Sequence, residues 1–146
     1  MNNTDKKFKI GYTQGVYDMF HIGHLNLINR AKELCEYLVV GVNSDELVKT
    51  YKHKETVINE FDRAEIVRNL KAVDKCIIVD TLDKLELQKE LGFNAIFIGD
   101  DWYGNPRWMQ TRDILAKYGV DVVFLPHTEG VSSTMLRPKS IDSIEG

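Results

Sequence analysis

Two histidines in a glycine-containing segment are the clearest candidates for chemistry in this sequence. Residues 15–24 place His21 and His24 on either side of Gly23. Imidazoles donate hydrogen bonds and titrate near neutral pH, which suits them to phosphate oxygens, and a glycine leaves room for a nucleotide. The segment follows an apolar run and leads into a helical pattern, so the N-terminus of a helix should favour an anion there. These residues predict a phosphate clamp with two imidazoles.

The same histidine string also fits a chance occurrence, a metal-binding pair or two solvent-exposed side chains. A zinc site would require further cysteine or histidine ligands, and none is apparent near His21 and His24. The two cysteines, Cys35 and Cys76, lack a metal-type spacing and lie in apolar segments, so we expect buried free thiols. No protein ligand for a metal ion is predicted.

A hydroxyl-rich segment follows the last apolar run of the chain. It begins after Pro126 and His127 and consists of Thr128, Glu129, Gly130, Val131, Ser132, Ser133 and Thr134. Hydroxyl groups and backbone N–H groups at the start of a helix donate to phosphate oxygens. The segment therefore predicts a second set of phosphate contacts, and the alternative is a simple serine or threonine N-cap.

Polar connections also follow the second and fourth apolar runs. The first carries Lys49, Lys52 and Lys54, and we expect a flexible loop that closes over phosphates, or else the solvated loop in which most lysines occur. The second is a Gly-Asp-Asp-Trp turn that includes Asp101 and Trp102. By composition alone it is a common surface turn, but its place at the end of a strand puts two carboxylates and an aromatic ring near a ligand site.

Short apolar runs alternate with helical patterns along the chain. The runs predict five strands, at residues 9–13, 37–43, 75–79, 94–98 and 121–125. Helices are predicted from about 24 to 35, after an N-cap at Asn59 and after the pair Asn105-Pro106. Near-continuous apolar strands with helices between them favour a parallel sheet covered on both faces. We therefore predict a Rossmann-like, doubly wound α/β fold with a five-stranded, mainly parallel sheet, helices on both faces, and ligands at the carboxyl ends of the strands.

The bulk properties limit the class of protein. The 146 residues are expected to form one domain, 1–146, with a core at about 9–137 and looser termini. A net charge of −3 gives no general attraction to nucleic acid or to anionic membranes. No apolar run has the length of a membrane span, and the polar start MNNTDKKFKIGY lacks the apolar segment of a signal peptide. We expect a cytoplasmic protein without a nucleic-acid or membrane partner.

Together these motifs give the chain a resemblance to a known enzyme family. Over about residues 9–137 it resembles the bacterial glycerol-3-phosphate cytidylyltransferases and, more loosely, the catalytic domains of choline- and ethanolamine-phosphate cytidylyltransferases. The resemblance implies transfer of CMP from CTP, carried with Mg²⁺, to a phosphorylated alcohol, with release of pyrophosphate. The Gly-Asp-Asp-Trp turn and Lys84 match the glycerol enzymes, which implies glycerol 3-phosphate as the acceptor and CDP-glycerol, a unit of cell-envelope polymers, as the product. It also implies a homodimer that pairs around the histidine motif.

The resemblance also implies roles for individual residues. His21 and His24 would contact the triphosphate and stabilise charge at the reacting α-phosphate, with Lys52 as a third catalytic residue. Lys52 and Lys54 are hard to separate, because the lengths of the matching stretches differ by one residue. The implied nucleotide-binding residues are Val16, Tyr17, Gly23, Lys54, Asp101 and residues 127–134, and the implied acceptor-binding residues are Asp18, Arg63, Lys84 and Trp102. Trp108 and Arg112 are expected to serve packing and the surface.

The resemblance leaves two questions open. His127 stands where the family usually has a phosphate-binding arginine. Either His127 contacts the triphosphate as a weaker, pH-dependent cation, or it faces solvent or a dimer partner while Arg137 or a loop lysine supplies the charge. The nucleotide is the second question, because adenylyltransferases for flavin mononucleotide or sugar phosphates share the histidine motif. A non-catalytic nucleotide-binding sensor is a further alternative, which the intact histidine pair disfavours.

Overall fold

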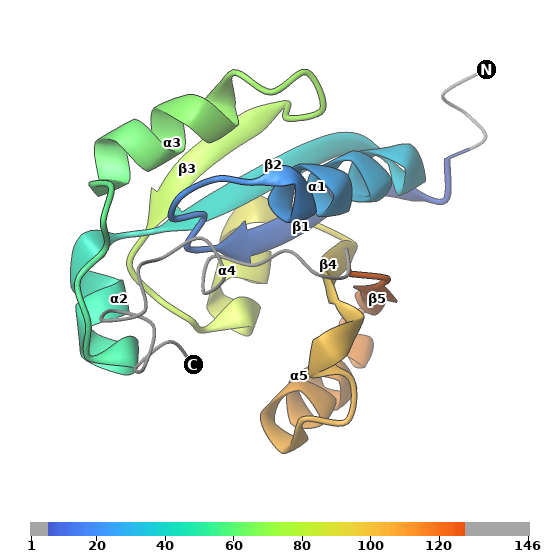
Figure 1. The fold of residues 1–146 in the computed structure, drawn as a ribbon. Helices are drawn as coiled ribbons and strands as arrows, with labels where there is room; N and C mark the ends of the chain where they lie inside the picture. Colours follow the sequence, from blue (N-terminus) through green and yellow to red (C-terminus); the bar gives the residue numbers. More distant parts are fainter. Residues whose placement is uncertain (1–5, 128–146) are drawn as a thin grey trace.

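A computed structural model describes residues 6–127 and shows a parallel sheet flanked by helices (Figure 1). Five strands form one sheet in the order β3-β2-β1-β4-β5, and every neighbouring pair is parallel. In chain order the elements are β1 (Phe8–Gly15), α1 (Ile22–Leu34), β2 (Cys35–Asn43), α2 (Asp45–Lys52), α3 (Glu60–Arg68), β3 (Lys75–Val79), α4 (Lys84–Leu91), β4 (Ala95–Gly99), the 3₁₀ turn η2 (Asp100–Trp102), α5 (Pro106–Ala116) and β5 (Asp121–Leu125). This order confirms the predicted Rossmann-like α/β fold.

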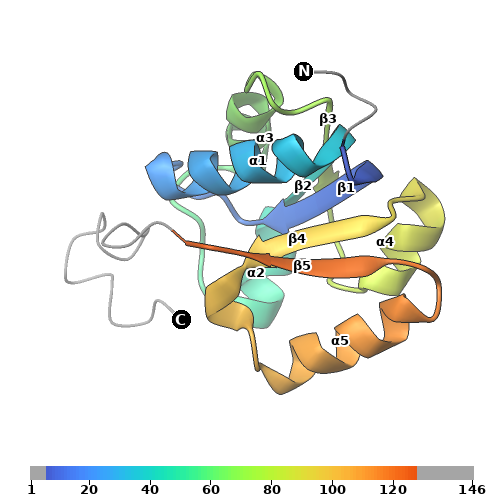
Figure 2. The same ribbon diagram turned by 90° about the vertical axis from the view of Figure 1, so that its right-hand side faces the viewer.

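Helices cover both faces of the sheet (Figure 2). On one face α1 and α3 pack against the strands, and Ile28 and Val67 lie in the core between them. On the other face α4 and α5 contribute Leu87 and Leu115 to a second core around Tyr12. Because both faces are buried, the strands read as continuous apolar runs in the sequence. In residues 6–127 every helix is too short or too polar to span a bilayer.

Capping residues begin the helices at the positions that the sequence indicates. Asn59 accepts a hydrogen bond from the Asp62 N–H at 2.9 Å at the start of α3. Asn105 caps α5 in the same way, and Pro106 is the first residue of that helix. The helix α4 was not predicted from the sequence. Asp83 caps its start, and Gly92, with a φ of 73°, ends it. The sequence signals for this helix are therefore capping residues, as they are for α3 and α5.

The expected loop is wrong for Lys49 and Lys52, because they lie in the helix α2, whereas Lys54 follows the helix in the connection to α3. The Ser44 hydroxyl accepts from the Leu47 N–H at 3.1 Å and caps the helix. Acidic residues lie in its first turn and Lys49 and Lys52 in its last turn, which suits the helix dipole. Val48 is the buried residue of this eight-residue helix. Leu47, Val48 and Tyr51 recur at helical spacing, but a segment of eight residues is shorter than the window in which such a pattern predicts a helix.

Candidate active site at the carboxyl edge of the sheet

The candidate site lies at the edge of the sheet where the strands end. β1 and β4 are neighbours, but the chain leaves β1 for α1 on one face and leaves β4 for α5 on the other face (Figure 2). In doubly wound folds such a change of direction marks the place where ligands bind. The histidine motif follows β1, and Asp101 and Trp102 follow β4. The fold therefore brings both predicted segments to the same edge.

His21 and His24 cap the first turn of α1 with their own side chains. His21 is the N-cap residue, and its Nδ1 accepts a hydrogen bond from the Gly23 N–H at 3.1 Å. The Nδ1 of His24 accepts from the His21 N–H at 3.2 Å. The two rings stack with their centroids 3.8 Å apart. Because the first N–H groups of a helix lack partners within it, the backbone that the imidazoles cap also holds them in place.

These hydrogen bonds decide where each imidazole carries its proton. A ring nitrogen that accepts carries no hydrogen, so each neutral ring has its hydrogen on Nε2. Burial lowers the pKa of His21. Burial first, and then the neighbouring His21, lower the pKa of His24 to about 4, against an opposite effect of Asp18. Both rings are thus neutral at pH 7, and the clamp is a pair of oriented Nε2–H donors.

An uncommon turn carries the chain from β1 to the histidines. Tyr17 and Met19 have positive φ angles of 56° and 51°, which non-glycine residues adopt only where the surroundings hold them. Asp18 supplies the hold: it is 3% exposed, and its carboxylate accepts from the N–H groups of Val57 at 2.8 Å and Ile58 at 3.0 Å. Asp18 thereby fastens the turn to the segment before α3. Its contact with an acceptor stays a prediction.

Two aromatic rings pack against the imidazole of His24. Tyr17 is buried and meets the His24 ring edge-on, with the centroids 5.4 Å apart. The Phe20 ring lies 5.3 Å from the same imidazole. Desolvation by such neighbours disfavours a charged imidazole. Tyr17, predicted to bind the nucleotide, therefore helps to keep His24 neutral and oriented.

Arg63 is buried and forms hydrogen bonds to three segments of the site. Its side chain is fully buried and donates to the carbonyl oxygens of Ile58 at 2.7 Å, Val16 at 2.8 Å and Asn43 at 2.8 Å. It also forms an ion pair with Asp45. A guanidinium satisfies several acceptors in fixed directions, so Arg63 joins the ends of β1 and β2 to the start of α3. The structure thus gives Arg63 a structural role, and its contact with an acceptor stays a prediction.

A chain of polar side chains beneath the site has no counterpart in the sequence analysis. The Tyr12 hydroxyl donates to the Gln14 carboxamide at 2.7 Å, and the Gln14 amide group donates to the Asn43 side chain at 2.8 Å and to the Thr81 carbonyl at 3.0 Å. Asn43 in turn donates to the Tyr51 hydroxyl at 3.0 Å. The chain joins β1, β2, α2 and the connection before α4. The available signal was a polar residue at the end of an otherwise apolar strand.

Lys52 and Lys54, which the sequence did not separate, occupy different environments. Lys52 is the last residue of α2, and its ammonium lies 5.8 Å from the centroid of the Tyr51 ring. Lys54 follows the helix and is only 9% exposed. Both follow β2 at the carboxyl edge, so the structure keeps both as candidates for phosphate binding.

The turn after β4 contains Asp101, Trp102 and an unexpected partner for His127. The Asp101 carboxylate lies so close to Gly99 that a side chain there would meet it, and Trp102 is partly exposed. His127 Nδ1 lies 2.6 Å from the Asp100 carboxylate, and both side chains are about half exposed. The hydrogen bond from His127 holds the pKa of Asp100 below its ordinary value. Neither predicted environment of His127, triphosphate or solvent, included this carboxylate.

Lys84 lies at the start of α4, close to the first turn of α5. Its ammonium donates to the Leu82 carbonyl at 2.9 Å and lies 5.4 Å from the centroid of the Trp108 ring. Burial, and then the neighbouring Arg107, lower the pKa of Lys84 to about 8. Trp108 packs against the core as expected, and it also lines the hollow that holds Lys84.

Part of the predicted site lies outside the described residues. The hydroxyl-rich segment, residues 128–134, belongs to this part, as does Arg137. Within residues 6–127, no three histidine, cysteine, aspartate or glutamate side chains gather closely enough to hold a metal ion. The described site therefore consists of the histidine pair, the two lysines after β2, the turn after β4 and the Lys84 hollow.

Comparison with known proteins decides the family. A family model described as cytidylyltransferase-like matches residues 12–139. The chain belongs to this family. Glycerol-3-phosphate cytidylyltransferase of Bacillus spizizenii is 33% identical over 127 residues, which cover 86% of this chain and 92% of that protein. FAD synthase of Thermococcus kodakarensis is 34% identical over 131 residues, which cover 87% and 85%. This cytidylyltransferase-like chain is thus a member of the nucleotidyltransferase superfamily.

Other relatives are longer or more distant. The bifunctional protein HldE of Hyphomonas neptunium is 35% identical over 90% of this chain, but the cytidylyltransferase-like chain spans only 27% of the length of that protein. Among solved structures, the lipopolysaccharide core biosynthesis protein of Thermoplasma volcanium superposes with a TM-score of 0.68 at 23% identity, over 83% of this chain and 97% of that one. Pantoate-beta-alanine ligase of Francisella tularensis gives 0.64 at 14% identity, over 97% and 69%. At these identities the likeness shows the fold alone.

Proposed function

We propose that the protein transfers CMP from CTP to a small phosphorylated alcohol, glycerol 3-phosphate, and releases CDP-glycerol and pyrophosphate. The observation that carries the proposal is the stacked pair of neutral imidazoles, His21 and His24, whose Nδ1 atoms are bound by the start of α1. Their Nε2–H groups are left to donate to phosphate oxygens. The similarity to a glycerol-3-phosphate cytidylyltransferase over nearly its whole length supports the choice of substrates.

The proposed reaction needs positioning and electrostatic stabilisation, and no enzyme nucleophile. An oxygen of the acceptor phosphate attacks the α-phosphorus of CTP, in line with the bond to the departing pyrophosphate. Charge develops on the equatorial and leaving oxygens, where donors that are already oriented stabilise the transition state most. His21 and His24 supply such donors at the start of α1, and Lys52 supplies a positive charge from the end of α2.

Mg²⁺ is proposed to enter with the nucleotide. A magnesium ion is usually held by substrate phosphates and one or two protein oxygens, with water completing the shell. Such an ion needs no cluster of three protein ligands, so the residues present are compatible with Mg²⁺ carried on the triphosphate. Its chemical contribution would be to neutralise charge on the phosphate oxygens. No protein ligand is assigned to it.

The strongest alternative is transfer of AMP from ATP. The similarity to an FAD synthase favours it, because FAD contains an adenosine monophosphate unit. The two reactions use the same phosphate chemistry and differ in the base that is recognised. A nucleotide-binding sensor without catalysis would bind CTP but release no pyrophosphate.

A screen of nucleotides and acceptors tests the proposed function. The protein is incubated with Mg²⁺, with CTP or ATP, and with glycerol 3-phosphate, choline phosphate, ethanolamine phosphate or a sugar phosphate, and pyrophosphate is measured. We expect the fastest release with CTP and glycerol 3-phosphate, and the same preparation of a His24→Ala variant controls for contaminating activity. Faster release with ATP contradicts the proposal in favour of adenylyl transfer. CTP binding without release from any acceptor contradicts catalysis itself.

A contact of His127 with the triphosphate leads to a pH-dependent prediction. If His127 binds the triphosphate, its cationic form binds CTP better, so KM for CTP should rise between about pH 6 and 8, across the ordinary histidine range. A His127→Arg variant stays charged, so its KM should be lower at pH 8 and change less with pH. The two KM profiles are measured side by side, which removes the titration of CTP itself. Parallel profiles would show that His127 has no phosphate contact.

Two further expectations, one from the resemblance and one from the polar start of the sequence, stay proposals. A homodimer that pairs around the histidine motif is one, and a cytoplasmic location is the other. The structure holds a single chain and tests neither.

A further inference from the structure

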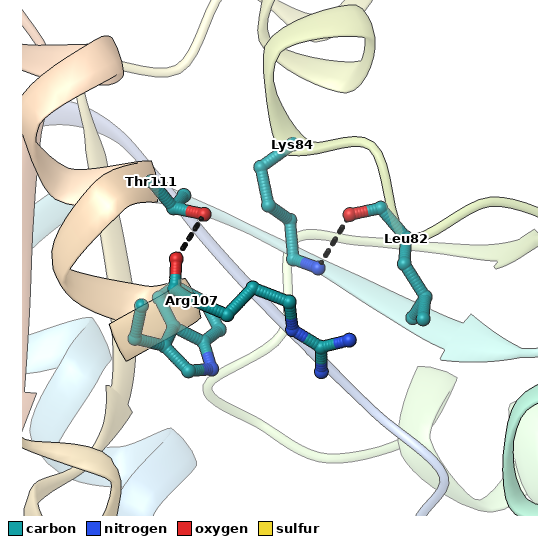
Figure 3. A pocket seen from close by; sticks show the side chains of 5 residues that line it. Leu82, Lys84, Arg107 and Thr111 are labelled. Carbon is teal, nitrogen blue, oxygen red and sulfur yellow. Dashed lines mark hydrogen bonds between the residues drawn. The ribbon is translucent and has the colours of Figure 1, made fainter. Parts of the chain in front are cut away.

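A hollow lined by cationic and aromatic side chains opens between the starts of α4 and α5 (Figure 3). Its volume is about 90 Å³, which is room for several water-sized groups. The residues that line it are Leu82, Lys84, Arg107, Trp108 and Thr111. The resemblance assigned Lys84 to the acceptor, but it assigned no role in binding to Arg107, Trp108 or Thr111.

The charge in the hollow is positive. Lys84 and Arg107 extend toward each other from α4 and α5 (Figure 3), and the positive charge of Arg107 contributes to the lowered pKa of Lys84. Within residues 6–127, neither side chain forms an ion pair with a carboxylate. The charge of the neighbouring Asp83 acts against the lowering of the Lys84 pKa, but the Oδ1 of Asp83 is engaged in capping α4, where it accepts from the N–H groups of Leu85 and Glu86. Two cations without an ion-pair partner among the described residues, Lys84 half-buried and Arg107 exposed, favour an anionic ligand.

The backbone around the hollow is fixed, and it faces the same edge of the sheet as the histidines. The Thr111 hydroxyl donates to the Arg107 carbonyl at 2.9 Å within α5, and Asn105 caps the same helix. On the opposite wall, Gln14 at the end of β1 donates to the Thr81 carbonyl just before α4. Both walls follow the carboxyl ends of strands, β3 and β4. The hollow therefore lies at the same carboxyl edge of the sheet as the histidines.

We propose that this hollow binds the phosphate of the acceptor, with Arg107 as the second cationic ligand beside Lys84, and that it selects an uncharged alcohol over an amino alcohol. The inference rests on the proposed function and names the residue that determines the acceptor class. Arg107 attracts the phosphate and repels an ammonium group held a few ångströms away in the same small molecule. Glycerol 3-phosphate fits these requirements, whereas ethanolamine phosphate carries the unfavourable charge.

The kinetic test compares two arginines on one helix. In Arg107→Gln, KM for glycerol 3-phosphate should rise about tenfold or more, the scale of losing a charged hydrogen bond. KM for CTP should change by less than about twofold, because the nucleotide lies at the histidines. Arg112→Gln is the matched control: Arg112 lies in the next turn of α5, 3.6 Å from Asp113 and outside the hollow. We expect it to change neither KM.

The preference between acceptors distinguishes phosphate binding by Arg107 from a purely structural role, because a structural role would leave this preference unchanged. The ratio of kcat/KM for glycerol 3-phosphate to that for ethanolamine phosphate should fall in Arg107→Gln, because the attraction for one and the repulsion for the other are both lost. An unchanged ratio together with an unchanged KM for glycerol 3-phosphate would overturn the inference, even though CMP transfer itself would stand.

Binding of glycerol 3-phosphate to the hollow can also be measured without catalysis. Trp108 lines the hollow, and the chain has only two tryptophans. Its indole N–H signal, assigned with Trp108→Phe, should shift when glycerol 3-phosphate is added in the presence of a non-hydrolysable CTP analogue. The half-saturating concentration should rise about tenfold in Arg107→Gln. Absence of a shift in the unmodified protein would overturn the inference, and a shift without pyrophosphate release would instead contradict the proposed function.

Discussion

Replacing His24 by alanine is expected to lower kcat at least 100-fold, the scale of losing one oriented donor to the transition state. The Nδ1 of His24 is bound by the His21 N–H at 3.2 Å, so its Nε2–H is already directed before the substrate arrives. Such a donor needs no reorganisation as charge develops on the phosphate. The loss should therefore appear in kcat and in kcat/KM alike, with a smaller change in KM for CTP. Steady-state pyrophosphate release measures these constants.

Two conservative variants separate the chemistry from the capping of α1. In His24→Asn the side-chain oxygen takes the place of Nδ1, so the cap is kept and the phosphate donor is lost. In His24→Gln the amide reaches the place of Nε2, so a donor returns while the cap is lost. We expect His24→Asn to fold normally but to remain slow, and His24→Gln to recover part of the rate. Near-normal kcat in His24→Asn would reject the proposed donor.

The protonation state of the pair is directly measurable in the free protein. Burial, and then the neighbouring imidazole, depress the pKa of His24 to about 4, so the ring gains its second proton only at acidic pH. Nitrogen chemical shifts should report a neutral Nε2–H tautomer from pH 8 down to about 5. An imidazolium at pH 7 would mean that the clamp works through charge, as a lysine does.

The second large effect is expected for folding and concerns Arg63. Arg63→Met should lower the free energy of unfolding by about 3 to 5 kcal/mol, because removing the buried guanidinium leaves three carbonyl oxygens without their donor, at about 1 to 3 kcal/mol for each one that stays unsatisfied. Three carbonyl oxygens and Asp45 lose their donor in this variant. Urea unfolding followed by circular dichroism gives the free energy.

A second arginine on α3 provides the control for Arg63→Met. Arg68 lies in the last turn, and its ion pair with Glu65 is exposed, with both side chains 59% exposed. Surface pairs of this kind contribute at most about 1 kcal/mol. The free energy of unfolding of Arg68→Met should therefore be close to that of the unmodified protein. An unchanged free energy in Arg63→Met, accompanied by a raised KM for the acceptor, would instead support the acceptor contact that the resemblance implied.

Local signals in the sequence were enough to predict the framework of this protein. Apolar runs such as the one at β2 and caps such as Asn59 and Asn105 depend on neighbours within a few residues. The order of elements then follows, because a strand-helix alternation with buried strands permits few topologies. In that fold a motif directly after β1 must lie at the carboxyl edge, so the place of His21 and His24 was predictable from the chain alone. The helix α2 escaped prediction, because it spans only eight residues and its helical pattern is correspondingly short.

The chemical state of the site was decided only by the tertiary structure. The sequence identified two histidines, but hydrogen bonds to the start of α1, and for His24 also packing against Tyr17 and Phe20, make them neutral Nε2–H donors. Arg63 read as a residue near the acceptor, and its partners turned out to lie in the backbone of segments distant in sequence. The joining of Lys84 and Arg107 in one hollow likewise depends on how α4 and α5 pack. Burial and the distances between charges set these properties, and both arise only when remote parts of the chain come together.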